Sequence, residues 1–278
     1  MGRQPKLIVA VGAKFIGKTY TTLGQIITYA QGNPKKGISP RKVLIFDVNG
    51  EFPEFKRLSI KHVAAYSAHP KVDIRRITTQ KDDGGTMNPN EMQDALSAIL
   101  RNYKTGLLLI EDISTYTSDS IGADLVGTLA TQRHIGVDVI IHFQTKSKAG
   151  HPQIVGMMSL MRIHKTMDNF EKHKGKFTNN LDLLKVAEAL VENENSKLDP
   201  KKQWFYCYAD FDIGKVRGSF NKKQFSEAIS IYVSQNEKQI VSPLLNSKDR
   251  KGNKIYSSYE QAYNQVEKDL FNKFYGNS

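Results

Sequence analysis

The sequence has very little cysteine and no long apolar run, and each deficit excludes a class of protein. Its one cysteine, Cys207, cannot form a disulfide within the chain, which excludes a disulfide-stabilised secreted domain. No stretch approaches the roughly 18 apolar residues of a membrane-spanning helix. The first apolar run, residues 7–11, ends at Gly12 and is too short for a signal peptide. We therefore expect no membrane insertion and a cytoplasmic location.

Acidic residues are scarce relative to basic ones. The 278 residues include 40 Lys and Arg but only 28 Asp and Glu, which gives a formal net charge of +12. This surplus favours a polyanionic partner, and nucleic acid is the commonest. A basic surface also occurs on proteins that are merely soluble. The hydrophobic fraction of 39% is ordinary for a globular chain, and the length suits one large domain with or without appendages.

The most informative stretch is GAKFIGKT, residues 12–19, which follows an apolar run and precedes a predicted helix. It matches the phosphate-binding loop G-x-x-x-x-G-K-[ST] in the strand–loop–helix context that this loop requires. Backbone N–H groups and the helix N-terminus attract phosphate, Lys18 can reach the β- and γ-phosphates, and the Thr19 hydroxyl can hold Mg²⁺. Lys14 can contact phosphate or point to solvent. The predicted nucleotide-binding residues are Gly12, Ala13, Lys14, Phe15, Ile16, Gly17, Lys18, Thr19 and Tyr20.

Two later apolar strands end in acidic residues. Residues 43–46 lead into D-V-N-G-E, which ends at Glu51, and residues 105–110 lead into Glu111 and Asp112. The carboxyl ends of parallel strands are where α/β sheets bind ligands. In an NTPase one such carboxylate completes the Mg²⁺ shell and another polarises the attacking water. Because side chains alternate along a strand, Glu111 and Asp112 are expected to point to opposite sides. The alternative is a pair of solvated acids at a turn.

A fourth strand is predicted at residues 137–143 and is followed by Gln144. A polar residue at that position can sense the γ-phosphate or hold the water, although it can also be an ordinary strand-end amide. Arg133 lies before this strand, where the C-terminal end of a predicted helix would favour a cation.

The rest of the chain predicts further elements and two basic regions. A short strand is possible at 62–66, a fifth strand at 162–166 and a hairpin over 204–211 and 215–220. Residues 225–240 predict an amphipathic helix, and residues 242–254 have the composition of a linker. Basic residues concentrate at 56–81 and 146–176, including Lys146 and Arg162; they either line a nucleic-acid channel or form a solvated surface. We predict a domain at 1–241 and a C-terminal linker and helical tail at 242–278.

Taken in order, the motifs resemble those of the FtsK–HerA group of P-loop ATPases, over roughly residues 5 to 220. The matching segments are GAKFIGKT (12–19), IFDVNGEF (45–52), LLLIED (107–112) and TQRHIGVDVIIHFQT (131–145). The resemblance implies a three-layer α/β fold of the additional-strand, RecA-like class with a mainly parallel central sheet. It also implies binding of ATP and Mg²⁺.

Site roles follow from the resemblance position by position. Thr19 and Glu111 match the metal-holding residues, Asp112 the catalytic acid, Gln144 the polar sensor and Arg133 an arginine finger acting on a neighbouring subunit. The family's usual order is Asp then Glu, whereas this chain has Glu then Asp. Because the Asp112 side chain is one methylene shorter than a glutamate, Glu51 is a rival catalytic base.

The resemblance implies an ATP hydrolase that translocates DNA as a ring, expected to be a homo-hexamer. A compact basic chain without membrane helices is most similar to viral genome-packaging ATPases, which implies host cytoplasm and a portal or capsid protein as possible partners. Three other functions remain open. They are a nucleotide-dependent assembly or scaffold protein with weak or no ATPase, a phage morphogenesis or conjugation ATPase, and a small-molecule or nucleotide kinase. A GTPase is disfavoured because no N-K-x-D motif occurs.

Overall fold

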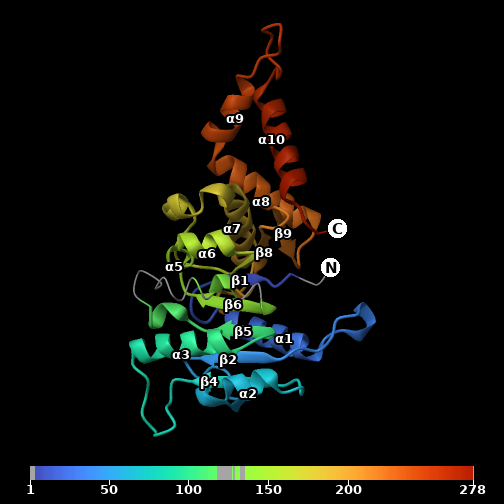
Figure 1. Cartoon of the computed structure of the whole chain (residues 1–278). Helices are drawn as coiled ribbons and strands as arrows, with labels where there is room; N and C mark the ends of the chain where they lie inside the picture. The colour runs from blue at the N-terminus through green and yellow to red at the C-terminus, as the bar shows by residue number, and fades with distance from the viewer. Residues whose placement is uncertain (1–3, 118–126, 128, 132–134, 278) are drawn as a thin grey trace. The chain divides into compact units, whose positions relative to one another are not determined.

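The structure, a computed structural model, describes residues 4–117, 127, 129–131 and 135–277 (Figure 1). The chain forms two compact units. The first comprises residues 1–161 with 166–168, and the second comprises residues 162–165 with 169–278. The boundary predicted between residues 241 and 242 falls inside helix α9 (Glu237–Leu245) of the second unit. The assignment of an ATPase domain and a tail stays a prediction.

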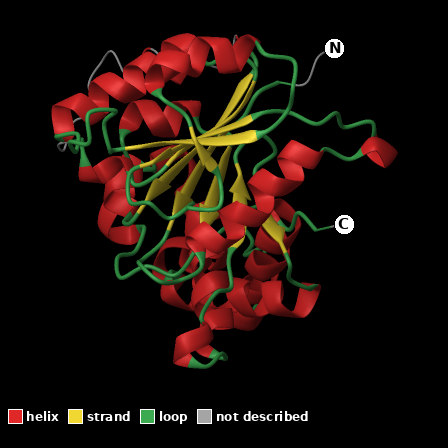
Figure 2. Cartoon of the chain, turned by 90° about the horizontal axis from the view of Figure 1, so that it is seen from below, coloured by secondary structure: helices red, strands yellow, loops and turns green. Residues whose placement is uncertain are grey.

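A parallel sheet forms the centre of the first unit (Figure 2). Its strands lie in the order β3-β4-β2-β5-β6-β1. They are β1 (Leu7–Val11), β2 (Val43–Asp47), β3 (Lys56–Arg57), β4 (Ile74–Thr78), β5 (Gly106–Ile110) and β6 (Val137–Phe143). Strand β6 therefore lies between the strand before the phosphate loop and the strand before Glu111 and Asp112. This insertion confirms the predicted additional-strand class and its mainly parallel sheet.

Strands β1, β2, β5 and β6 are mostly apolar because both of their faces are covered. Every residue of β2, β5 and β6 is buried. On one face, Ile26 of helix α1 (Lys18–Gln31) packs in a cluster with Ile45, Leu109 and Ile140. On the other face, Phe46 makes an edge-to-face contact with Tyr116 at 5.6 Å between ring centroids. The predicted site residues lie at the carboxyl ends of these buried strands.

Further helices complete the first unit. They are α2 (Val63–Ala68), α3 (Pro89–Asn102), α5 (Lys146–Ala149) and α6 (Pro152–Met157). Helix α3 begins with a capping box in which Asn88 accepts from Glu91 N and Glu91 accepts from Asn88 N. The short strand predicted at 62–66 is wrong, since residues 63–68 are helical and bury Val63. Helix formation here satisfies the backbone without a neighbouring strand.

The second unit is a helical assembly with an antiparallel hairpin. Its elements are α7 (Leu181–Ser196), β8 (Cys207–Asp210), β9 (Lys215–Gly218), α8 (Lys222–Gln235), α9 and α10 (Tyr259–Phe274). Strand β7 (Leu160–Ile163) spans the division between the units in the sequence, two residues earlier than predicted. The helix predicted at 225–240 is interrupted at Asn236, where α8 ends and α9 begins. Phe225 of α8 packs against Phe271 of α10 at 5.5 Å between ring centroids.

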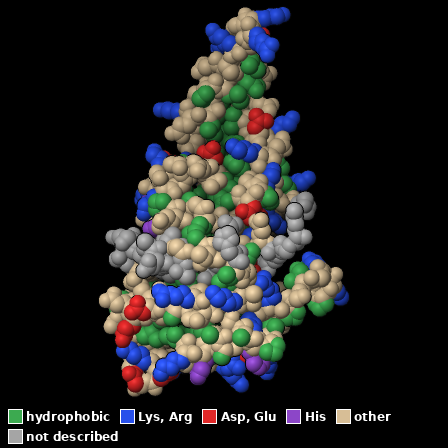
Figure 3. Space-filling view, in the orientation of Figure 1, with side chains coloured by type: hydrophobic (Ala, Val, Ile, Leu, Met, Phe, Trp, Pro, Cys, Tyr) green, Lys and Arg blue, Asp and Glu red, His purple; other side chains and the backbone are tan. Residues whose placement is uncertain are grey.

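Basic side chains are spread over the visible surface (Figure 3), but two predicted surface cations are buried. Lys146 is 2% exposed and its ammonium group donates to Asp168 O at 2.7 Å. Arg162 is fully buried, and burial lowers its pKa, partly opposed by Tyr208. These two residues therefore cannot belong to the basic surface predicted at 146–176. In the described part of the chain, no helix has the length and apolar character needed to cross a membrane.

Candidate active site

The loop between β1 and α1 has the backbone of a phosphate cradle. Gly12 N donates to Phe143 O at 3.2 Å, which fixes the start of the loop to β6. Gly17 adopts a left-handed conformation, φ 80° and ψ 13°, immediately before α1 begins. A side chain would strain that conformation, so glycine is required there. Phe15 also has positive φ, at 62°, and its side chain is 98% exposed.

Lys18 is the first residue of α1 and folds back over the loop. Its ammonium group donates to Gly12 O at 2.6 Å and to Ala13 O at 2.8 Å. These carbonyl contacts hold the cation over the loop at the positive end of the helix. An anion bound in the loop would therefore meet Lys18 and the helix N-terminus together.

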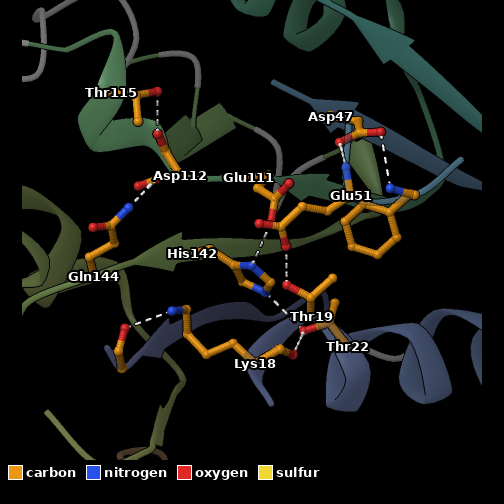
Figure 4. Close-up of polar contacts among 12 residues, drawn as sticks. Lys18, Thr19, Thr22, Asp47, Glu51, Glu111, Asp112, Thr115, His142 and Gln144 are labelled. Carbon is orange, nitrogen blue, oxygen red and sulfur yellow. Dashed lines mark hydrogen bonds and ion pairs between the residues drawn. The ribbon is translucent and has the colours of Figure 1, made fainter. Parts of the chain in front are cut away.

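Asp47 organises the D-V-N-G-E turn after β2. Its carboxylate accepts from Glu51 N at 2.8 Å and from Phe52 N at 3.2 Å. Arg76 forms an ion pair with this fully buried carboxylate at 2.9 Å. Gly50, with φ 73°, allows the turn to close. The turn directs Glu51 towards the phosphate loop, where its carboxylate accepts a hydrogen bond from the Thr19 hydroxyl (Figure 4).

Glu111, at the end of β5, is only 3% exposed and lies beside Glu51 in Figure 4. The pKa of its carboxyl group is raised to about 9, mainly by burial and to a smaller extent by the charges of Glu51 and Asp47. A buried carboxyl group with acidic neighbours is stabilised as an anion when a cation enters. The Thr19, Glu51 and Glu111 oxygens thus form an acidic cluster next to the phosphate loop.

His142 joins this cluster and was not among the residues predicted from the sequence. It is 2% exposed, with Nε2 at 2.8 Å from the Thr22 hydroxyl and Nδ1 at 3.5 Å from Glu111 Oε1. The ring therefore connects β6, helix α1 and the end of β5. A histidine inside the apolar run VDVIIHF was the available signal, but the sequence argument considered only the residues that end the strands.

Asp112 has different partners from Glu111, and both residues lie beyond the end of β5 at Ile110, so strand alternation does not set their directions. It adopts a left-handed conformation, φ 38° and ψ 53°, and is 7% exposed. Its carboxylate accepts from Ser114 Oγ at 3.0 Å and from Gln144 Nε2. Figure 4 shows the Asp112–Gln144 pair on a different side of the site from Glu51 and Glu111. Non-glycine residues in this backbone region carry strain that is commonly found at functional sites.

The structure thus brings together most, but not all, of the predicted site residues. Lys18, Thr19, Glu51 and Glu111 meet at the carboxyl ends of neighbouring strands, and Asp112 pairs with Gln144. Side chains in the loop region that point outward belong to Lys14, Phe15 and Tyr20. Arg133 lies outside the described residues.

The cluster fits Mg²⁺ only in combination with a nucleotide. Among the residues that the structure describes, no three His, Cys, Asp or Glu side chains are arranged to hold a metal ion by themselves. In phosphate-transfer sites Mg²⁺ takes one or two protein oxygens and completes its shell with phosphate and water. The Thr19 hydroxyl and the Glu111 carboxylate, whose pKa is raised first by burial and then by the neighbouring acidic groups, are oxygen ligands of that kind.

The sheet order and the loop geometry define the fold as that of an additional-strand P-loop NTPase. A comparison with solved structures found similar folds in viral proteins. The genome packaging NTPase B204 from Sulfolobus turreted icosahedral virus 2, in complex with AMP, matches with 16% identity and a TM-score of 0.52. The match covers 79% of this chain and 99% of that one.

Two related structures give the same result. The same NTPase in complex with ATP-gammaS matches with 16% identity, a TM-score of 0.52 and coverage of 78% and 97%. B204, the DNA-packaging ATPase from Sulfolobus turreted icosahedral virus, matches with 15% identity, a TM-score of 0.50 and coverage of 77% and 97%. Comparisons with protein-family models and with curated protein sequences found no match. The predicted resemblance to packaging ATPases is therefore confirmed at the level of the fold.

Proposed function

We propose that this protein is a Mg²⁺-dependent ATPase that couples ATP hydrolysis to DNA translocation, in the packaging of a viral genome. The observation that carries the proposal is the meeting of Lys18 with the acidic cluster of Thr19, Glu51 and Glu111 at the phosphate loop. This arrangement supports binding of a nucleoside triphosphate together with a divalent cation. The fold shared with genome-packaging NTPases supports the choice of process.

In this proposal the phosphates bind to the backbone of residues 12–19, and Lys18 turns from the loop carbonyls to the β- and γ-phosphates. Thr19 and Glu111 would hold Mg²⁺, which would neutralise charge on the phosphates. Thr19 donates a hydrogen bond to Glu51, so Glu51 lies beside a proposed ligand of Mg²⁺. We therefore assign Glu51 a positioning role and treat it as the second candidate for the catalytic base.

Asp112 is the base that we favour. Gln144 and Ser114 orient its carboxylate on the other side of the site, where a water in line with the γ-phosphate can be held. The Asp112 carboxylate accepts the water proton as the water oxygen bonds to the γ-phosphorus. The bond from that phosphorus to the bridging oxygen breaks, and ADP and phosphate leave.

The proposed assembly is a homo-hexameric ring in the cytoplasm of a host, in which Arg133 of each subunit acts on the nucleotide of the next. A portal or capsid protein is a further proposed partner of the ring. The basic composition supports DNA as the polymer that is moved, since a phosphate backbone neutralises the chain's excess charge.

One assay tests the proposal. ATP hydrolysis is measured with single-stranded DNA, with double-stranded DNA and without DNA, beside the mass of the assembly with ATP. We expect DNA-stimulated hydrolysis and a six-fold assembly. Protein that binds ATP without hydrolysing it supports the rival function, a nucleotide-dependent scaffold, which the reversed Glu-Asp order keeps open. Phosphorylation of a small acceptor would instead identify a kinase.

A further inference from the structure

A basic loop, residues 246–254, connects α9 to α10 in the second unit. Its sequence, NSKDRKGNK, contains four cations and one carboxylate, a net charge of 4 − 1 = +3. All four cationic side chains are exposed, and none forms an ion pair with a described residue. Figure 3 shows Lys and Arg side chains gathered at this end of the helix pair. The four are Lys248, Arg250, Lys251 and Lys254.

The basic loop is a closed structure rather than the linker that its composition predicted. Asp249 N donates to Asn253 O at 2.8 Å, and Ile255 N donates to Ser247 O at 3.2 Å. The Asp249 carboxylate accepts from Lys251 N at 2.8 Å and from Asn253 N at 2.9 Å. These N–H groups, first that of Asn253, lower the pKa of Asp249. The only acidic group of the loop is therefore committed to its own backbone.

This closed conformation crowds charges of one sign. Lys248 and Lys254 face each other in an antiparallel bridge. Like charges directly opposite one another destabilise such a pair. Arg250 and Lys251 lie between them in the sequence, so the repulsion is not relieved within the loop. A polyanion would remove this repulsion, whereas solvent only screens it.

The adjoining surface of α10 offers hydrogen-bonding groups. A shallow groove of about 440 Å³ is lined by Ile255, Tyr256, Gln261, Asn264, Gln265 and Lys268. The Asn264 amide makes no hydrogen bond with a described side chain or backbone group. One wall thus carries three amides next to a lysine, with a half-buried tyrosine beside it. Within the chain, Gln261 accepts from Ser257 and Gln265 donates to Asp269, so Asn264 is the amide most available to a ligand.

We propose that the basic loop binds the phosphate backbone of nucleic acid and that the groove on α10 receives the adjoining nucleotides. No apolar residue occurs in 246–254, and the groove adds only Ile255 and Tyr256, whereas interfaces between proteins have apolar centres. Interfaces with nucleic acid are polar and positively charged. These features favour nucleic acid over an acidic protein. That the polymer is DNA rests on the proposed function; the contact site itself does not.

The test uses the full-length protein and a variant in which Lys248, Arg250, Lys251 and Lys254 are all changed to glutamine. A control variant carries the same number of changes at exposed lysines elsewhere, namely Lys35, Lys36, Lys201 and Lys202. Binding of a fluorescent mixed-sequence DNA duplex, the matching single strand and poly-glutamate is measured by anisotropy at several salt concentrations. ATP hydrolysis without DNA is measured in parallel.

We expect the loop variant to bind DNA at least about tenfold more weakly, with the salt slope reduced by about three to four. The control variant should lose much less affinity, and hydrolysis without DNA should match the parent in both. Equal losses in the two variants would overturn the proposal, because the loop would then be one basic surface among others. So would a loss confined to poly-glutamate, which would indicate an acidic protein partner.

Failure of the proposed function gives a different result. If the parent protein hydrolyses no ATP but binds DNA through the basic loop, the ATPase motor is wrong and the loop assignment stands. If DNA stimulates hydrolysis equally in parent and loop variant, and both bind DNA equally, the motor stands and the loop assignment is wrong.

Discussion

Charges of one sign are crowded in two regions of this protein, and the two regions differ in how far these charges are exposed to solvent. In the first unit the carboxylates of Glu51 and Glu111 lie beside each other, and Glu111 is 3% exposed. In the basic loop of the second unit the cations lie in solvent. Burial raises the pKa of Glu111 to about 9, so the folded protein can relieve the repulsion by taking up a proton. The exposed cations have no comparable relief.

We expect the two regions to bind different counter-ions because they differ in exposure to solvent. The buried Glu111 carboxyl group and the exposed Glu51 carboxylate lie next to the phosphate loop, where they can accept a small dication together with phosphate. An exposed, closed loop can engage a long polyanion along its whole length. The two regions should therefore respond to different changes. Substitutions in the acidic cluster should alter ATP hydrolysis, and substitutions in the basic loop should alter binding of a polyanion.

Removing Lys18 should have the largest effect. Lys18→Ala removes the cation over the phosphate loop, and we expect ATP hydrolysis to fall by at least about 10²–10³-fold. The fold should be retained, since the Lys18 ammonium group donates to the carbonyls of Gly12 and Ala13, which belong to the phosphate loop and not to the apolar core. Lys35→Ala, an exposed change outside the site, is the matched control. Hydrolysis at the parent rate by Lys18→Ala would refute the site assignment.

Substituting each of the two candidate bases, Asp112 and Glu51, should show which of them accepts the proton of the attacking water. Asp112→Asn should lower kcat by about 10²-fold or more with little change in the Mg²⁺ requirement, because the base is lost. Glu51→Gln should mainly raise the Mg²⁺ concentration for half-maximal rate, because Glu51 is tied to Thr19. Steady-state rates over a Mg²⁺ series measure both. The reverse pattern would transfer the role of base to Glu51.

His142 should have a smaller, indirect effect. Since its ring lies between Thr22 and Glu111, His142→Asn should raise the Mg²⁺ concentration for half-maximal rate by about tenfold. Thr22→Val, which alters only the helix side of this contact, should change it less. An unchanged Mg²⁺ requirement in His142→Asn would mean that the histidine serves packing alone.

The pH dependence of stability should reveal the buried carboxyl group. Between about pH 4.5 and pH 9 the folded protein holds a proton on Glu111 that the unfolded chain has released. The free energy of unfolding should therefore fall as pH rises, by up to about 1.4 kcal/mol per pH unit. Glu111→Gln should flatten this dependence in urea unfolding with EDTA at pH 6, 7 and 8. Equal slopes in parent and variant would contradict the assigned pKa.

Much of the fold could be predicted because buried parallel strands are continuous apolar runs. The strands at 7–11, 43–46 and 137–143 were predicted within one residue. The phosphate loop and the acids that follow β2 and β5 were also predicted. They could be found because each follows the last apolar residue of a strand, and parallel strands bring their carboxyl ends to one edge of a sheet.

Other features depend on tertiary contacts that composition does not encode. Lys146 and Arg162 were predicted at the surface because charged residues are usually exposed, but both are buried. His142 was missed because only residues that end the strands were considered, and its contacts with Thr22 and Glu111 arise from the fold. The loop at 246–254 has the composition of a linker, and its closure depends on the turn formed around Asp249.

The central claim is that the acidic cluster and the phosphate loop form one nucleotide–metal site. A crystal structure with Mg²⁺ and a non-hydrolysable ATP analogue tests it most directly. We predict that the β- and γ-phosphates contact the backbone of residues 12–19 and Lys18, and that Mg²⁺ contacts the Thr19 hydroxyl and Glu111. Phosphates bound elsewhere, or a metal ion bound away from Thr19 and Glu111, would contradict the account.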